Sequence, residues 1–94
     1  MEKLNLFIDN QYVESAAAEY YDVYNPSTGE IIARAPKCTQ DEALKAVEAA
    51  YRAFPAWRDT PVLKRMQVLH NVRRLLVEEM DELTMSVARE NGKA

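Results

Sequence analysis

The first third of the chain carries short apolar runs of the kind that form β-strands. Residues 4–8 begin as an alternation of apolar and polar side chains. Asp9 and Asn10 follow, and both residue types tolerate the left-handed conformations that a tight hairpin turn needs. Residues 11–13 can return as the partner strand, so we predict an antiparallel hairpin over about residues 4–13.

A second antiparallel hairpin is predicted over about residues 20–35. Residues 20–24 are rich in Tyr and Val, which favour strands. Residues 25–29, Asn-Pro-Ser-Thr-Gly, are the clearest turn signal in the chain, because Pro fixes one φ and Gly supplies a positive one. Pro36, which has no N–H to donate to a strand ladder, is expected to end the strand after this turn or to hold it to an edge position.

Beyond the second hairpin, apolar side chains recur every three or four residues, which is the period of an amphipathic helix. Thr39 and Glu42 form a capping-box pattern at the start of this region. We therefore predict a first helix over about residues 40–54, and we expect Pro55 to end it.

A longer apolar stripe predicts two further helices, over about residues 61–79 and 81–91. Thr60 is expected to cap the first of them with Pro61 at its first position, and Asp81 is expected to cap the second. Arg73 fills the one gap in the stripe. Its apolar members are Val62, Met66, Leu69, Leu76, Met80, Leu83 and Val87.

Asn91 and Gly92 supply a cap signal at the end of the last helix. Together these elements predict an α+β fold, with a β-hairpin region over residues 1–36 and a helical region over residues 37–94. We treat residues 1–94 as one partial domain, because short hairpins are marginal alone and the helices carry more apolar surface than these strands can cover. We therefore expect an exposed apolar face, which marks an interaction surface or an aggregation liability.

Composition narrows the class of protein. The chain has 94 residues, of which 48 % are apolar and 29 % are charged, so it is not a disordered polar tail. A net charge of −3 argues against a general electrostatic grip on nucleic acid. Two glycines are too few for a G-x-G-x-x-G loop. No apolar run approaches a membrane span, and no signal peptide is evident, so we expect a cytoplasmic protein.

The residue types that often carry chemistry do not form an active-site pattern. Cys38 is the one thiol, and a small buried or half-buried side chain is its expected role. His70 has no second ligand at helical spacing and is expected to be packed or solvated. Phe54 and Trp57 are expected to be a packing anchor between two helices. A small enzyme using Cys38 and His70 is the least favoured hypothesis, and we assign no catalytic residue.

Three stretches in register resemble the N-terminal portion of the NAD(P)-dependent aldehyde dehydrogenase superfamily. They are residues 25–32 (Asn-Pro-Ser-Thr-Gly-Glu-Ile-Ile), residues 53–58 (Ala-Phe-Pro-Ala-Trp-Arg) and residues 89–93 (Arg-Glu-Asn-Gly-Lys). Residues 54–65 look most like the branch that oxidises methylmalonate or malonate semialdehyde. That branch makes an acyl-CoA product.

The resemblance implies a scaffold role. In this family such a segment forms the outer hairpins and first helices of the cofactor-binding domain, while the dinucleotide-binding strands, catalytic cysteine and general-base glutamate lie further along a much longer chain. No catalytic or nicotinamide-contacting residue carries over, so we expect this chain to be inactive by itself. NAD and CoA belong to the complete enzyme. The expected partner is the remainder of an aldehyde dehydrogenase or a second copy, and the alternative is a standalone interaction module that uses the Val62–Val87 stripe.

The resemblance also implies a weak monovalent-cation site. Several family members hold such a cation with carbonyl oxygens just before the Asn-Pro pair and with a carboxylate near the third motif. The matching positions here are Val23, Tyr24 and Glu90. A cation held by so few oxygens is expected to bind weakly.

Overall fold

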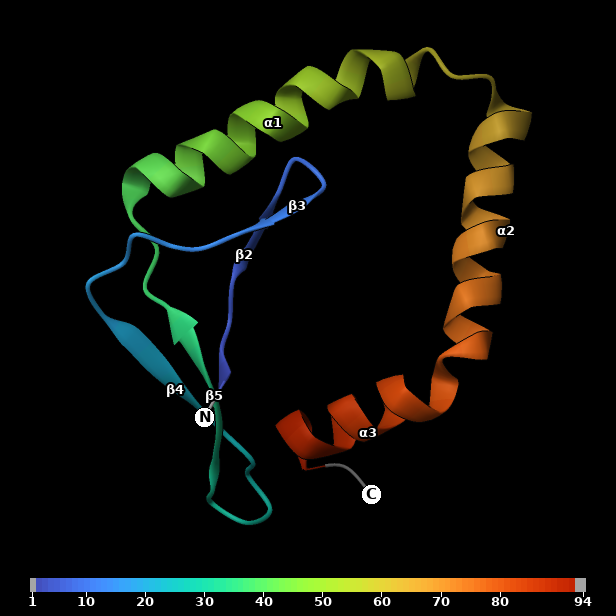
Figure 1. The fold of residues 1–94 in the computed structure, drawn as a ribbon. Coiled ribbons are helices and arrows are strands. Elements are labelled where there is room, and N and C mark those ends of the chain that lie inside the picture. The colour runs from blue at the N-terminus through green and yellow to red at the C-terminus, as the bar shows by residue number, and fades with distance from the viewer. Residues whose placement is uncertain (1, 93–94) are drawn as a thin grey trace.

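The fold is described from a computed structural model, which describes residues 2–92. It confirms the α+β class (Figure 1). In chain order the elements are β1 (Glu2–Lys3), β2 (Leu6–Ile8), β3 (Gln11–Val13), β4 (Tyr20–Tyr24), β5 (Ile31–Pro36), α1 (Gln40–Arg58), α2 (Val62–Glu78) and α3 (Met80–Asn91).

Both predicted hairpins are present. β2 pairs antiparallel with β3, and Asp9 and Asn10 between them have φ angles of 52° and 62°, as a tight hairpin turn requires. β4 pairs antiparallel with β5 around the Asn-Pro-Ser-Thr-Gly turn, where Gly29 has a φ of 76°. β5 ends at Pro36, which confirms the first of the two alternatives for this proline, whereas the edge position is wrong because β5 is the central strand of its sheet.

One pairing was not predicted from the sequence. β1 lies parallel to β5, with Glu2 opposite Ala33, and this pairing gives a three-stranded sheet in the order β1-β5-β4. Two residues carry no hydrophobic period that a sequence pattern could detect, and their partner strand lies about thirty residues away.

The predicted end of the first helix is wrong. α1 continues through Pro55 to Arg58. Proline removes only its own N–H from the ladder, and the carbonyl of Pro55 still accepts a hydrogen bond from the N–H of Asp59 at 3.0 Å. The capping box at the start of α1 is confirmed, because Thr39 and Glu42 exchange side-chain-to-backbone hydrogen bonds.

The caps of the later helices also differ from prediction. Pro61, not Thr60, is the N-cap of α2, and the Thr60 hydroxyl instead donates to the Ala56 carbonyl at 2.7 Å. The break between α2 and α3 is confirmed, but it centres on Glu79, and Asp81 lies inside the first turn of α3. A carboxylate there still interacts favourably with the helix dipole.

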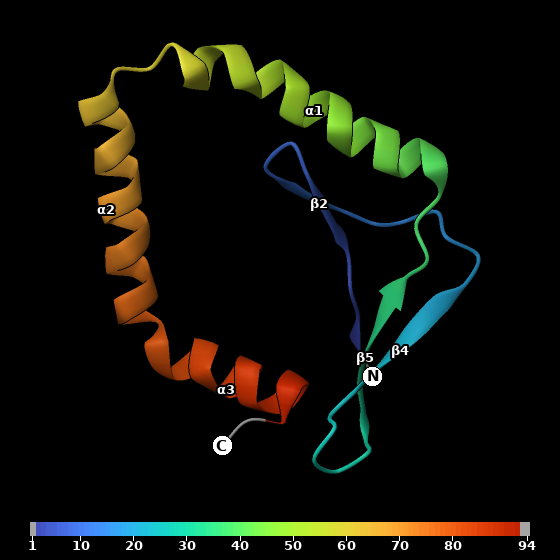
Figure 2. The ribbon, with the colours of Figure 1, turned by 180° about the vertical axis from the view of Figure 1, so that it is seen from behind.

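The three helices follow one another around an arc and leave much of their surface uncovered (Figures 1 and 2). The radius of gyration is 16.9 Å, whereas a compact chain of this length has a value of about 12 Å. Ala33 and Ser15 are the buried residues of the described chain. The expectation of an exposed apolar face is therefore confirmed. None of the described helices is long and apolar enough to cross a bilayer.

Candidate functional site

The Glu42 carboxylate ties the connector after β3 to the start of α1. Its Oε1 accepts hydrogen bonds from the Ser15 hydroxyl at 2.8 Å and from the Thr39 N–H at 3.0 Å. Its Oε2 accepts one from the Ala16 N–H at 3.0 Å. These donors, the Thr39 N–H first, favour the ionised form and lower the pKa of Glu42. Glu42 therefore acts structurally, as a fully engaged acceptor.

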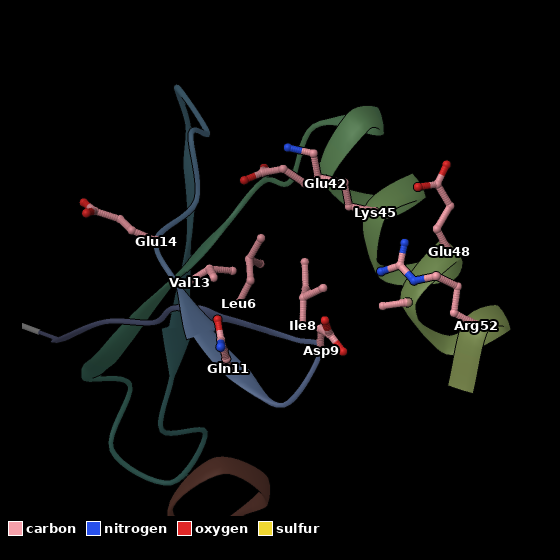
Figure 3. Close-up of a pocket in the computed structure, with 11 residues that line it drawn as sticks. Leu6, Ile8, Asp9, Gln11, Val13, Glu14, Glu42, Lys45, Glu48 and Arg52 are labelled. Carbon is pink, nitrogen blue, oxygen red and sulfur yellow. The ribbon is translucent and has the colours of Figure 1, made fainter. Parts of the chain in front are cut away.

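Beside Glu42, a groove of about 380 Å³ opens between α1 and the β2–β3 hairpin (Figure 3). Its apolar floor comes from the hairpin, and its charged rim comes largely from α1. The lining residues are Leu6, Ile8, Asp9, Gln11, Val13, Glu14, Glu42, Lys45, Glu48, Ala49 and Arg52. This mixture of carboxylates and cations offers polar contacts, but no thiol or hydroxyl side chain is among the lining residues. Within residues 2–92, no three His, Cys, Asp or Glu side chains gather as a metal-binding group.

Cys38 and His70 do not come together. Cys38 is exposed, so the prediction of a buried or half-buried side chain is wrong; it lies in the short connection between β5 and α1, where nothing in the described chain covers it. Its thiol lies 3.7 Å from the Pro36 carbonyl oxygen. His70 is exposed on α2 and lines a separate depression with Arg73 and Arg74.

The packing anchor predicted at Phe54 and Trp57 is not formed within residues 2–92. Phe54 is 54 % exposed and Trp57 is 43 % exposed. The guanidinium of Arg58 lies 5.6 Å from the centre of the Phe54 ring. The reason is that α1 and α2 diverge at the intervening turn, so no second helix packs over these rings (Figure 1).

Two faces of α1 have different surroundings. Its alanines line shallow cavities against the β2–β3 hairpin; they are Ala43, Ala46, Ala49, Ala50 and Ala53. The larger apolar side chains Leu44, Val47, Tyr51 and Phe54, spaced by three and four residues, all remain exposed. The helical period predicted for this region rests on Ala43, Val47, Ala50 and Phe54, which come from both faces, because apolar positions were counted without regard to side-chain size.

The stripe on α2 and α3 is also uncovered. Val62, Met66, Leu69, Leu76, Met80, Leu83 and Val87 are all exposed. The stripe predicted as a docking face is therefore accessible in this chain.

The residues predicted for a cation lie in two elements. Val23 is half-buried in β4, and Tyr24 ends that strand at an irregularity in its register. Glu90 is exposed in the last turn of α3. The two elements meet nearby, because a Cβ built on Gly92 would lie 3.0 Å from Pro26. The cation site itself stays a prediction. Lys93, from the third motif, lies outside the described residues.

Comparison with known proteins supports the resemblance. The sequence model of the aldehyde dehydrogenase family matches residues 12–94. The chain belongs to the aldehyde dehydrogenase family. Mouse methylmalonate-semialdehyde/malonate-semialdehyde dehydrogenase [acylating] is 42 % identical over 90 residues, which are 96 % of this chain and 17 % of the relative. Malonate-semialdehyde dehydrogenase of Bacillus pumilus is 40 % identical over all 94 residues, which are 19 % of that protein.

Solved structures agree with the sequence relatives. The methylmalonate-semialdehyde dehydrogenase DddC of Oceanimonas doudoroffii has a TM-score of 0.88 and 33 % identity, over 96 % of this chain and 18 % of its own. A structure from Sinorhizobium meliloti, described as a methylmalonate-semialdehyde dehydrogenase complexed with NAD, has a TM-score of 0.88 and 31 % identity, over 96 % of this chain and 18 % of its own. The chain thus spans less than a fifth of the relatives that it matches.

Proposed function

We propose that this chain is an N-terminal scaffold segment of an aldehyde dehydrogenase-type oxidoreductase and is catalytically inactive by itself. The complete enzyme oxidises a semialdehyde with NAD, and CoA receives the acyl group. The observation that carries the proposal is the match of nearly the whole chain to semialdehyde dehydrogenases that are more than five times as long. The mouse relative is an acylating dehydrogenase and the Sinorhizobium meliloti structure holds NAD, and both facts support these cosubstrates.

The geometry of the described residues supports a scaffold role. The groove beside Glu42 offers charged side chains and an apolar floor but no thiol, which cysteine-dependent aldehyde oxidation requires. Cys38 and His70 lie on different parts of the surface. The ordered elements instead present apolar helix faces, which are suited to packing.

A chimera tests this proposal. The 94-residue chain replaces the stretch that it matches in the Bacillus pumilus enzyme, and NADH formation is followed with malonate semialdehyde, NAD and CoA. We expect turnover by the chimera and none by the isolated chain. Turnover by the isolated chain would contradict its inactivity. A folded chimera without turnover would contradict the scaffold assignment.

The second candidate function is a standalone interaction module. The exposure of the Val62–Val87 stripe favours it, since a separate dehydrogenase remainder or a second copy could cover that face. Light scattering of the isolated chain across concentration separates the two functions. A module that pairs with itself forms a defined dimer, whereas a monomer that ignores candidate partners argues against docking.

Two finer assignments belong to the same proposal. Val23, Tyr24 and Glu90 would contribute oxygens to a weak monovalent-cation site, and the approach of α3 to the turn after β4 supports their proximity. Isothermal titration of the chimera with K⁺ and Na⁺ tests this cation site, and Glu90→Ala should abolish the heat of binding.

We also propose a cytoplasmic location, while several relatives are described as mitochondrial.

A further inference from the structure

Arg65 interrupts the apolar face of α2. Val62, Arg65, Leu69, Val72 and Leu76 follow one another at alternating intervals of three and four residues, so their side chains share one face of the helix. The four apolar members are all exposed, at 46–63 %. Arg65 is the one residue of α2 that is not exposed. A charged side chain thus lies among apolar residues of which Val62, Leu69 and Leu76 belong to the stripe predicted to dock.

The guanidinium of Arg65 has an unmet hydrogen-bonding need. Its Nε is buried from solvent and has no hydrogen-bond partner within the described chain. A guanidinium stays protonated in proteins and carries only donors, so a buried Nε–H needs an oxygen acceptor. An unpaired donor of this kind is costly. A surface that covered this face of α2 without offering an acceptor would bury the whole charge of Arg65 unpaired.

The uncovered area shows that the covering surface must be large. The chain exposes 8081 Å², whereas a compact protein of this mass exposes about 5,500 Å². The difference is several times the area of about 800 Å² that each partner buries in a standard interface. A small ligand cannot supply so much surface.

The structures of two relatives indicate which chain supplies the covering surface. The same open arrangement recurs with a TM-score of 0.88 inside two dehydrogenases of which it is 18 %. A segment keeps an open arrangement within a larger protein when the rest of that protein packs against it. The occupant of the apolar face is therefore the remaining part of an aldehyde dehydrogenase chain.

We propose that Arg65 is the polar anchor of this packing, and that the remainder of the dehydrogenase contributes a carboxylate to its guanidinium. This inference rests on the proposed function. A carboxylate matches the fork of Nε and Nη donors with two parallel hydrogen bonds and neutralises the buried charge. The apolar neighbours of Arg65 on this face exclude water from the pair of guanidinium and carboxylate. Arg65 therefore fixes the register at which α2 packs. Arg65 is a positioning residue and does not touch the substrate.

The test compares variants in the isolated chain and in the Bacillus pumilus chimera. Arg65→Met removes both charge and donors, and Arg65→Gln keeps an N–H donor without the charge. Arg74→Met is the matched control, since Arg74 lies on the same helix outside the face that holds Arg65 and pairs with Glu78 at 2.9 Å. Helix content is followed by circular dichroism in the isolated chain. The midpoint of thermal unfolding and NADH formation are followed in the chimera.

We expect opposite effects in the two contexts. In the isolated chain, Arg65→Met leaves helix content unchanged or raises it, because the variant removes an unpaired buried donor. In the chimera, both Arg65 variants lower the midpoint by several degrees more than Arg74→Met does. The chimera could instead lose soluble yield with the Arg65 variants alone. That result also supports the anchor role if the isolated variant chains keep their helix content.

Other outcomes overturn the inference in distinguishable ways. If the unmodified chimera folds without dehydrogenase activity, the proposed function fails. If it is active and Arg65→Met behaves like Arg74→Met, only the anchor role fails. If Arg65→Gln behaves like the unmodified chimera, the acceptor is not a carboxylate. If Arg65→Met lowers stability equally in the chimera and in the isolated chain, the acceptor belongs to this chain. If the isolated chain forms a concentration-dependent dimer that Arg65→Met dissociates, the acceptor belongs to a second copy.

Discussion

Gly92 lies so close to Pro26 that a Cβ on the glycine would be 3.0 Å from the Cγ of the proline ring. Gly92 is the left-handed C-cap of α3, and Pro26 belongs to the turn between β4 and β5. The end of the last helix therefore packs against the turn of the second hairpin. This contact closes the arc of helices onto the strands (Figure 1).

Gly92→Ala should destabilise the chain more than Gly29→Ala. Both glycines have positive φ angles, of 67° and 76°, and an L side chain in that region costs about 1–2 kcal/mol. A Cβ on Gly29 meets nothing within 4 Å, so that variant reports the backbone cost alone. The Cβ of Gly92→Ala also presses on Pro26 and on the Ser27 hydroxyl oxygen, both at 3.0 Å. Urea unfolding followed by circular dichroism measures the difference, and equal losses would mean that α3 does not pack on the turn.

Pro55→Ala should raise the stability of the isolated chain by about 1–3 kcal/mol, because proline in a helix interior is about 3 kcal/mol less favourable than alanine. Pro61→Ala is the control and should change little, since Pro61 is the N-cap of α2 and makes no side-chain cap hydrogen bond. Unfolding curves and helix content measure both variants. A loss of stability with Pro55→Ala would show that the proline directs the chain from α1 toward α2.

Glu42 should make the stability of the chain depend on acid. Hydrogen bonds from Thr39, Ala16 and Ser15 lower its pKa in the folded protein below the ordinary value of 4.5. Its contribution is then fully present above the unfolded value and is lost as pH falls through the lowered folded value. Glu42→Gln should flatten this part of the pH profile of the unfolding midpoint. Glu48→Gln is the control: it removes the same charge from a later position on α1 and should leave the slope of the pH profile unchanged. A profile for Glu42→Gln that keeps the unmodified slope would contradict this account.

The parts of the fold that local chemistry determines were predictable from the sequence. The Asp9-Asn10 turn, the turn ending at Gly29 and the capping box at Thr39 depend on residues only a few positions apart. The break between α2 and α3 was also predictable from nearby residues, but the residue that caps α3, Glu79, was not. Helix-end rules failed at Pro55, since one missing donor is compatible with a last helical turn.

Long-range relationships were not predictable in this way. The hydrogen bond between Ser15 and Glu42 and the parallel pairing of Glu2 with Ala33 join distant segments that no short motif connects. Arg65 was overlooked as a site residue because it is not a member of the stripe counted from the sequence, in which Arg73 fills the one gap. Only its burial and its unpartnered Nε in the fold single it out. The resemblance to a family pointed to the function, but it could not show which surface the segment leaves open.

Leu69→Ala should have different costs in the isolated chain and in the complete enzyme. In the isolated chain Leu69 is 63 % exposed, so truncation should change the free energy of unfolding by no more than about 0.5 kcal/mol. Once the remainder of a dehydrogenase covers the stripe, Leu69 becomes a core residue, and the same truncation should cost about 2–5 kcal/mol. Parallel unfolding of the isolated chain and of the Bacillus pumilus chimera measures both values. Gln67→Ala, outside the stripe on the same helix, should cost little in either context. A small cost for Leu69→Ala in the active chimera would place this face of α2 on the enzyme surface and would remove the packing on which the role of Arg65 depends.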